Sequence, residues 1–332
     1  MSILTAIIPI DLSYRAPDII EKAKRIIECA QKNNFLIRFG HNDQGTAKDR
    51  EFKNLVSRHE CCHNVSAVFY TEKINTSVLR NRAFDGTETE FLILLDVDIW
   101  PDYSIIEKYL NNLVQNQSPF EILPCLYLTK FGSKALTTSK ASISELKEKF
   151  FNYSRKEFLH LASPSSITLL RSIDYERIGG FDEDYAGHGY EDFDFLIRLA
   201  DAHNMLAAGR DFLHDRSARS PLFSVGFRRS LGELCIHKLI EKDFVFHIYH
   251  EKSNPKDYSN DRLSNYNIFK QKHAHRTSEW SPPDLTLISS FANTCQAEKH
   301  DIHNLSILYD NKPGHIDRFD TFKRRLRFLI ND

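Results

Sequence analysis

The sequence predicts an α/β protein in which helices flank one mainly parallel sheet. Short apolar runs, such as residues 3–10 and 90–96, have the length and composition of buried strands. Between these runs lie longer segments in which apolar residues recur every three or four positions, as on one face of an amphipathic helix. Alternation of strands and helices at this spacing is typical of βαβ units, which build parallel sheets.

The elements follow one another along the chain. The first strand, residues 3–10, is expected to end at Pro9 as it emerges at the sheet edge. A helix follows over residues 17–33, with Pro17 in its first turn. The later elements are a strand at 35–40, a helix at 48–59, a strand at 66–70, a helix at 76–85, a strand at 90–96, a helix at 104–115, strands at 121–128 and 166–170, a helix at 191–203 and a last strand at 244–251.

The length of 332 residues permits one large domain with an appendage, or two small domains. From residue 254 onward Pro, Asn and Ser become frequent and the periodic pattern fades. We therefore predict a main domain over residues 1–255 and a partly helical C-terminal extension over residues 256–332.

Charge and motifs argue against several classes of protein. Lys plus Arg number 44 and Asp plus Glu 45, so the basic excess expected of a nucleic-acid-binding protein is absent. No GxGxxG or Walker pattern follows the first strand, which argues against dehydrogenases and P-loop enzymes. Six cysteines without CxxC spacing indicate reduced thiols in a cytosolic protein.

The chain shows no sign of a membrane span or a signal peptide. No segment approaches the roughly 20 apolar residues that a membrane-spanning helix requires. The apolar N-terminus lacks a basic flank and a cleavage site, so it is interpreted as a strand. These features favour a cytoplasmic location.

Polar residues stand at the ends of three predicted strands. They are Asp11, Asn42 with Asp43, and Asp96 with Asp98. Ligands of parallel sheets bind in the crevice beyond the carboxyl ends of the strands, so these side chains should converge there. The arrangement suits a nucleotide, although no glycine-rich phosphate loop is present.

The stretch from Gly179 to Arg198 combines four glycines with a cluster of acids and continues into a helical pattern. Glycine lets the backbone take positive φ and approach a ligand closely. Glu191, Asp192 and Asp194 fall at or near the first helical turn, where the helix dipole stabilises negative charge. By itself, this stretch could equally be an acidic helix start after a glycine loop.

Residues 179–192 read Gly-Gly-Phe-Asp…Gly-His-Gly-Tyr-Glu-Asp, which resembles the C-terminal signature of the β-1,4-galactosyltransferases and of bacterial polysaccharide glycosyltransferases. Residues 94–101 contain Asp-Val-Asp, which resembles the metal motif of the same enzymes. Residues 79–82, Leu-Arg-Asn-Arg, resemble a run found in family 2 glycosyltransferases. The resemblance covers roughly residues 3–255 and implies a GT-A fold with a Rossmann-like, nucleotide-binding sheet.

The resemblance also implies an activity. It implies metal-dependent, inverting transfer of a hexose or N-acetylhexosamine, with galactose-type sugars favoured, from a UDP-sugar to a saccharide or lipid-linked saccharide acceptor. Bacterial capsule or lipopolysaccharide synthesis is the expected setting. The alternatives are a retaining transferase, a transferase that uses UDP-glucose, UDP-N-acetylglucosamine or a GDP-sugar, and a non-catalytic nucleotide-sugar-binding module of a larger synthase.

The resemblance assigns a metal site to the Asp-Val-Asp motif. Asp98 is the implied direct ligand, and Asp96 is implied to contact the nucleotide or the donor sugar. Oxygen ligands suit Mn²⁺ or Mg²⁺ better than zinc. A histidine from a strand after the acidic helix commonly completes the site in this family. His247 and His250 both qualify by position, and His250 is favoured by its local sequence.

The same resemblance assigns the sugar pocket and the base. Asp192 matches the catalytic carboxylate, and its neighbour Glu191 is implied to hold sugar hydroxyls. Gly180, His188 and Tyr190 are also assigned to substrate binding. His188 replaces the Trp of the family signature and Tyr190 replaces a Gly, which leaves the identity of the sugar open.

Nucleotide contacts are expected from two places. Arg80 and Arg82 are candidates for the diphosphate, with one of the two expected at the surface. Pro9, Asp11 and Asp43 are expected to line the nucleoside, an assignment that rests mainly on topology.

Two further segments carry alternative interpretations. Residues 209–230 are long and rich in arginine, so they form either a lid that closes on the diphosphate or a solvated surface loop. Residues 316–330 form a basic amphipathic run. It either lies on an anionic membrane, which would place the protein peripherally at the inner membrane, or packs back on the main domain.

Overall fold

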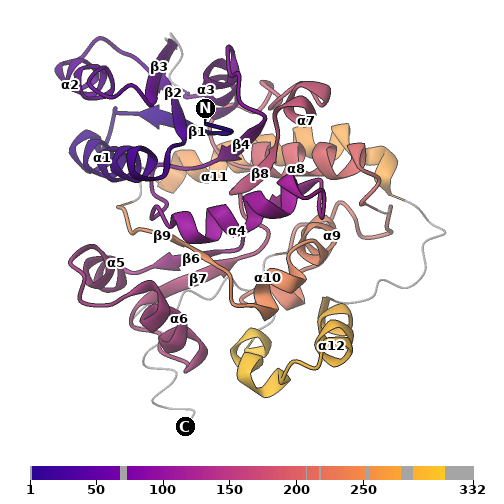
Figure 1. Cartoon of the computed structure of the whole chain (residues 1–332). Coiled ribbons are helices and arrows are strands. Elements are labelled where there is room, and N and C mark those ends of the chain that lie inside the picture. Colours follow the sequence, from indigo (N-terminus) through magenta and orange to yellow (C-terminus); the bar gives the residue numbers. More distant parts are fainter. Residues whose placement is uncertain are drawn as a thin grey trace. The chain divides into compact units, whose positions relative to one another are not determined.

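The computed structural model describes residues 2–67, 73–206, 208–216, 218–251, 255–277 and 287–310. Contacts divide the chain into two compact units (Figure 1). The first unit comprises Met1–Ile122, Ser166–Met205 and Glu251–Ala274, and the second comprises Leu123–Ser165, Leu206–His250 and His275–Asp332. Each unit has its own sheet.

The first unit contains a six-stranded sheet with the order β3-β2-β1-β4-β8-β5. Its strands are β1 (Leu4–Asp11), β2 (Leu36–Asn42), β3 (Cys62–Ala67), β4 (Phe91–Leu94), β5 (Phe120–Ile122) and β8 (Thr168–Arg171). The strands β1 to β4 are parallel, and β8 runs antiparallel between β4 and β5. The predicted fold class, an α/β protein with a mainly parallel sheet, is therefore confirmed.

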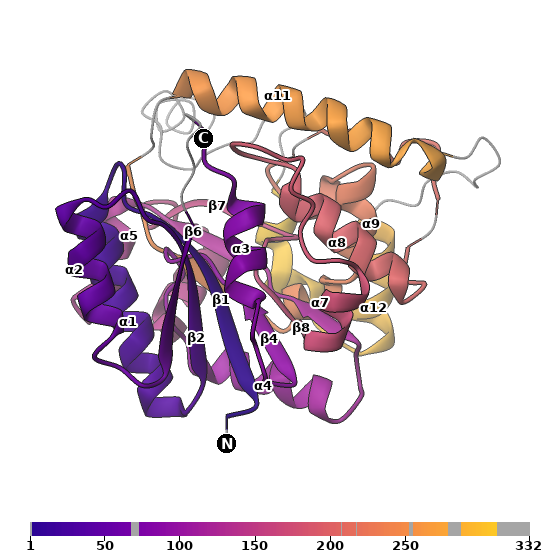
Figure 2. The same cartoon turned by 90° about the horizontal axis from the view of Figure 1, so that it is seen from above.

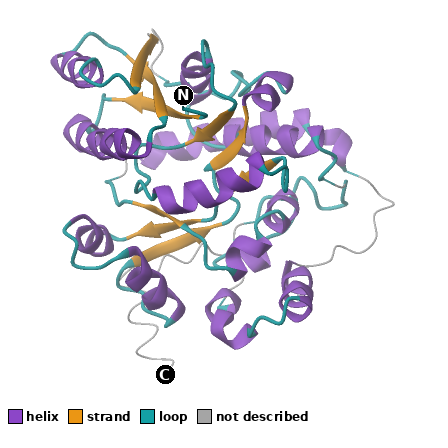
Figure 3. Ribbon diagram, viewed as in Figure 1, coloured by secondary structure: helices purple, strands orange, loops and turns teal. Residues whose placement is uncertain are grey.

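Four helices connect successive strands of this sheet, as expected of βαβ units: α1 (Ala16–Asn33), α2 (Ala47–Val56), α3 (Thr76–Phe84) and α4 (Tyr103–Val114). The helices α7 (Ser172–Arg177), α8 (Glu191–Ala202) and α11 (Pro255–Lys272) follow the last strand of this sheet, β8. Figure 3 colours the helices and strands by type. The buried face of α1 carries Ile19, Ile20 and Ala23, which match the predicted stripe. Side-chain caps help to fix three of the helix starts: Thr46 caps α2, Asn75 caps α3 and Asp102 caps α4.

The first strand and the strand expected at 66–70 differ from the expected ones for physical reasons. The first strand is central rather than an edge, and it continues past Pro9 to Asp11. Pairing between β1 and β4 ends at Ile7, so Pro9 lies beyond the residues that β4 pairs. The strand expected at 66–70 is β3, which begins at Cys62. It is an edge strand with largely half-buried residues, so no apolar run marks it, and residues 68–70 lie outside the described part of the chain.

The second unit contains a three-stranded sheet with the order β7-β6-β9. Its strands are β6 (Cys125–Leu128), β7 (Phe158–Ala162) and β9 (Val245–His247). Its described α-helices are α5 (Lys130–Thr137), α6 (Ile143–Phe151), α9 (Phe227–Glu233), α10 (Ile236–Ile240) and α12 (Leu287–Ala297). Phe150, Phe151 and Phe244 pack ring against ring in its core. The strand expected at 121–128 is in fact two strands, β5 and β6, in different sheets, with Pro124 between them.

The helix α11 packs on the first unit, where it lies beside α8 (Figure 2). Tyr266 stacks on Tyr190 with ring centroids 5.1 Å apart, and the Asn265 side chain donates to the carbonyl oxygen of Ala186 at 3.1 Å. These contacts divide the chain differently from the boundary near residue 255 that composition predicts. The division into a main domain over residues 1–255 and an extension over residues 256–332 stays a prediction.

The basic run at residues 316–330 lies outside the described residues. Among the helices that are described, none is both long and apolar enough to cross a membrane.

Candidate active site

The chain leaves the sheet of the first unit through the Asp-Val-Asp motif at the end of β4. All four residues of β4 are buried, and a turn from Asp96 to Ile99 follows, closed by a backbone hydrogen bond of 3.0 Å. Asp96 accepts hydrogen bonds from the Arg80 guanidinium at 3.0 Å and from the Ser166 hydroxyl at 3.1 Å. Because residues 96–99 form a turn, Asp96 and Asp98 do not share a face as residues two apart on an extended strand would.

Asp98 has different partners from Asp96. Its side chain is buried, and two cations contact it: Arg15, the residue before α1, and Lys22 of α1. Lys22 Nζ donates a hydrogen bond to Oδ1 at 2.7 Å. One guanidinium nitrogen of Arg15 donates to Oδ1 at 2.8 Å, and the other donates to Oδ2. The sequence analysis missed both cations. A signal existed for Lys22, because it lies three residues after Ile19 and four before Ile26, within the apolar stripe of α1.

Arg80 joins the two acidic motifs. It lies on α3, is buried, and donates to Asp96 at 3.0 Å and to Asp192 Oδ1 at 2.9 Å. Its guanidinium also lies over the ring of Phe181, 4.7 Å from the centroid. Arg82, by contrast, is 62% exposed, which agrees with the expectation that one of the two arginines lies at the surface. A diphosphate contact by either arginine stays a prediction.

Positive backbone angles shape the stretch before α8. A Cβ on Gly187 (φ +76°) would lie 2.1 Å from Asp261 Oδ2 of α11, and one on Gly180 (φ +68°) would lie 2.6 Å from Asn81 Oδ1. Only glycine allows these close approaches without displacing a neighbour. Tyr190 also has a positive φ of 72°, and it is buried against Tyr266.

These observations bear on the residues expected to bind substrate. Gly180 packs against Asn81 and Tyr190 packs against α11, so both have a structural role in the fold. His188 is half-buried in the same stretch. The contribution of α11 was not expected, because Asp261 and Tyr266 stand beyond the predicted domain boundary and match no motif.

The carboxylates at the start of α8 have unusual acidities. Asp192 is partly exposed, with 30% of its side chain accessible. Desolvation of the carboxylate by the surrounding protein is the main cause that raises the pKa of Asp192 to about 7. The positive charge of Arg80 lowers this pKa, and the negative charges of Glu191 and Asp96 raise it further. Burial also raises the pKa of Glu191. A group that titrates near neutral pH is suited to general acid–base chemistry.

Asp194, two residues later, has the opposite character. It is 1% exposed and accepts from His273 at 2.9 Å and from Arg198 at 2.8 Å. Burial alone would raise the pKa of Asp194, but these two donors outweigh it and lower the pKa. Asp194 is therefore a structural acid that ties α8 to the end of α11.

The strand ends carry a second polar group, as predicted from topology. Asp11 accepts from the amide of Asn42 at 3.1 Å, which links the ends of β1 and β2. Asp43 pairs with Lys53 at 2.6 Å, and this partner lowers the pKa of Asp43. Pro9 lies two residues before Asp11, opposite Gly40. The structure thus brings these residues to one edge of the sheet.

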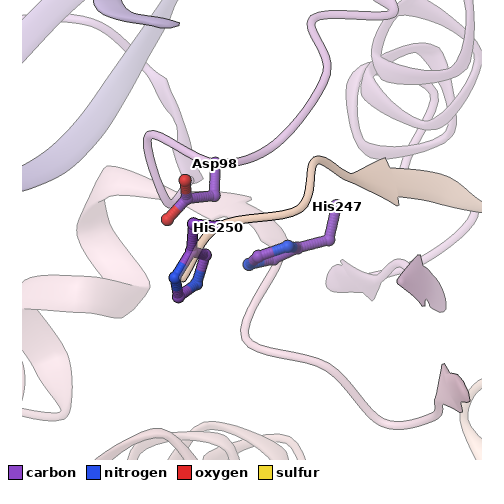
Figure 4. Close-up of side chains that lie close together, drawn as sticks. All are labelled: Asp98, His247 and His250. Carbon is purple, nitrogen blue, oxygen red and sulfur yellow. The ribbon is translucent and has the colours of Figure 1, made fainter. Parts of the chain in front are cut away.

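The two candidate histidines lie at the end of β9, in the second unit. Tyr127 of β6 stacks between His160 and His247, at centroid distances of 4.2 and 4.1 Å. The rings of His247 and His250 lie 5.3 Å apart. Figure 4 draws both histidines with Asp98. His247 is buried and held in the stack, whereas His250 is half-buried.

The described residues of the segment 209–230 include regular secondary structure and ion pairs. It includes the short helix η1 (Pro221–Phe223) and the start of α9. Three of its arginines pair with aspartates of the second unit: Arg219 with Asp310 at 3.1 Å, Arg228 with Asp215, and Arg229 with Asp211 at 3.0 Å. Closure of this segment on a diphosphate stays a prediction.

Comparison with solved structures finds glycosyltransferases at low identity and low TM-score. The catalytic domain of Drosophila β1,4-galactosyltransferase 7 with xylobiose matches with 14% identity, over 61% of this chain and 63% of that chain, at a TM-score of 0.33. A mannosyltransferase from Pyrobaculum calidifontis with GDP-Man and Mn²⁺ matches with 13% identity, over 92% and 85%, at 0.38. S. aureus TarS 1–349 with UDP matches with 12% identity, over 90% and 72%, at 0.38.

This chain therefore spans less than two thirds of the length of the Drosophila galactosyltransferase. No curated protein matches the chain. The sequence profile of Glycosyltransferase like family 2, however, matches residues 5–273, which include the Asp-Val-Asp motif, Arg80 and the whole acidic stretch. The chain belongs to this family, and its mainly parallel sheet agrees with the predicted α/β fold class.

Proposed function

We propose that this protein is a metal-dependent inverting glycosyltransferase that uses Asp192 as its general base. One observation carries the proposal: a partly exposed carboxylate at the start of α8 has a pKa of about 7 and is held by a buried arginine. An effective base has a pKa near the working pH, so that it is ionised yet still able to accept a proton.

The proposed reaction follows from this placement. The Asp192 carboxylate accepts the proton of the acceptor hydroxyl as the hydroxyl oxygen forms a bond to the anomeric carbon of the donor sugar. The bond from that carbon to the nucleoside diphosphate breaks on the opposite face, which inverts the anomeric configuration. Arg80 fixes the base against Asp96, so that the two motifs act together. Glu191 is proposed to hold sugar hydroxyls, and His188 to face the same sugar.

We propose that a divalent ion binds the ligands that the sequence resemblance implies. Asp98 offers carboxylate oxygens, and His247 and His250 each offer ring nitrogens. Mixed oxygen and imidazole ligation suits Mn²⁺ well, and Mg²⁺ would rely more on oxygen and water. When bound, the ion would neutralise negative charge on the leaving diphosphate. We favour His250 as the histidine ligand and propose that Tyr127 orients the ring of His247.

We propose a UDP-sugar of the galactose type as donor, with Pro9, Asp11 and Asp43 along the nucleoside. The link between Asp11 and Asn42 supports a common binding edge on β1 and β2. The acceptor would be a saccharide or a lipid-linked saccharide of bacterial capsule or lipopolysaccharide assembly. This setting is supported by the sequence resemblance. A cytoplasmic location and contact with the inner membrane through residues 316–330 are proposed from the sequence pattern alone.

The experiment is a panel of nucleotide sugars with and without Mn²⁺. Transfer or slow hydrolysis of one UDP-sugar, dependent on Mn²⁺ and lost in Asp192→Asn, is the expected result. Activity with GDP-mannose alone would overturn the proposed donor. Binding of a nucleotide sugar without any turnover would instead favour a non-catalytic binding module.

A further inference from the structure

Lys22 is a buried lysine in contact with the proposed metal ligand of the first unit. It is 4% exposed and lies within the apolar face of α1. Lysine is almost never fully buried unless it is paired. Its Nζ donates to Asp98 Oδ1 at 2.7 Å and to Asp18 Oδ2 at 2.9 Å.

The carboxylate of Asp98 is shared between two cations. Arg15 contacts both of its oxygens, and Lys22 contacts Oδ1. Asp18, an exposed residue of the same helix, pairs with the same two cations. The four side chains together carry two positive and two negative charges, so the cluster is neutral as it stands.

A divalent ion on Asp98 would change this balance. The ion must take an oxygen that Lys22 or Arg15 now contacts, and it would leave a buried ammonium group close to a dication. Like charges at such separations repel strongly where solvent is scarce. A buried cation that loses its carboxylate partner also loses the pairing that offsets its desolvation.

We propose that Lys22 is a resident counter-ion that weakens metal binding at Asp98 until a diphosphate arrives. The diphosphate adds negative charge, which offsets the repulsion between the ion and the two cations, Arg15 and Lys22. Metal and nucleotide diphosphate should therefore bind with positive coupling. This inference rests on the proposed function, because it takes Asp98 as a metal ligand.

The test measures binding of Mn²⁺ alone, by electron paramagnetic resonance of the free ion, to wild type and variants of the full chain. We expect Lys22→Met to bind Mn²⁺ about ten-fold more tightly or better, since one neighbouring positive charge is removed. Lys24→Met is the matched control. It lies on the same helix, is exposed, and removes the same charge beside Glu21, so its affinity should equal that of wild type.

Arg15→Gln provides a second variant, because Arg15 is partly exposed and its replacement leaves the buried lysine in place. It should also tighten Mn²⁺ binding. Addition of UDP should increase the Mn²⁺ affinity of wild type more than that of Lys22→Met, so the Mn²⁺ affinities of the two proteins should become similar.

Two results would overturn the inference. If Lys22→Met and Arg15→Gln bind Mn²⁺ as wild type does, while Asp98→Ala binds it more weakly, the counter-ion role is wrong and the proposed metal site stands. If Asp98→Ala binds Mn²⁺ as tightly as wild type, both the proposed metal site and the inference fail.

Discussion

Asp192 and Asp194 lie two residues apart at the start of α8, yet their surroundings act in opposite directions. Asp192 is partly exposed, shares one arginine with Asp96, and has a pKa raised to about 7. Asp194 is buried, has His273 and Arg198 as its own donors, and has a lowered pKa. The comparison shows that the balance between partners and burial, rather than burial alone, decides the acidity of each carboxylate.

The same comparison separates function from structure. A carboxylate such as Asp194, which accepts hydrogen bonds from two donors of its own, has a structural role and stays ionised across the physiological pH range. An acid that shares its cation with another acid is poised to exchange a proton near neutral pH. The predictions below test whether the two aspartates divide their roles in this way.

The largest effect is expected on the rate of sugar transfer. Asp192→Asn keeps the shape of the side chain and removes its basicity, so the rate should fall by about 10²–10⁴-fold while donor binding survives. Initial rates of transfer and a titration with the donor measure the two effects. Asp201→Asn, on the exposed face of the same helix, is the control and should transfer normally. A variant Asp192→Asn with near-normal transfer would mean that the base is elsewhere.

The next effect is on stability. Asp194→Ala leaves His273 and Arg198 without their shared carboxylate, so the free energy of unfolding should fall by about 3–5 kcal/mol. Urea unfolding followed by circular dichroism measures this. Because its pKa is lowered in the folded protein, Asp194 stabilises the fold above the ordinary value of 3.8, and this contribution is lost as pH falls. A loss below about 1 kcal/mol at pH 7 would show that Asp194 is not the structural acid.

A smaller effect is expected from Arg80. Its charge opposes the rise in the pKa of Asp192, so Arg80→Gln should move the acidic limb of kcat/KM to higher pH. Arg80→Lys retains a charge and should move the limb less. A uniform loss of rate at every pH, with no shift, would indicate that Arg80 only supports the fold.

The smallest effect is on thermal stability as a function of pH. Asp192 has a raised pKa in the folded protein, so its contribution is fully present below 3.8 and is lost as pH rises through about 7. Asp192→Asn should therefore raise Tm at pH 8 relative to wild type by more than at pH 4. Scanning calorimetry at both values measures the difference. Equal changes in Tm would contradict a raised pKa.

The sheet and the acidic motifs could be predicted because they follow from local patterns. The apolar run before Asp96 predicts a buried strand, and the glycines before Glu191 and Asp192 predict a turn into a helix. The polar strand ends were predicted from the topology of parallel sheets, and the structure places Asp11 beside Asn42.

Contacts between distant parts of the sequence could not be predicted in this way. The bridge from Arg80 to Asp96 and Asp192 joins three elements that no local pattern relates. The stacking of Tyr266 on Tyr190 depends on how α11 packs after the chain has returned to the first unit. The burial of Lys22 could have been predicted, because a lysine within an apolar stripe must have a buried partner. The identity of that partner could not have been predicted from the stripe.

The most direct test of the central claim is the pH dependence of kcat/KM for the wild-type protein, measured with the nucleotide sugar that the panel identifies as its donor. The account predicts that kcat/KM rises with pH to an apparent pKa of about 7 and is flat above it, because Asp192 must be ionised to accept the proton. Asp192→Asn should lose this limb and keep a low rate across the range. An apparent pKa near the ordinary value of 3.8, or an unchanged limb in Asp192→Asn, would contradict the assignment of Asp192 as the base.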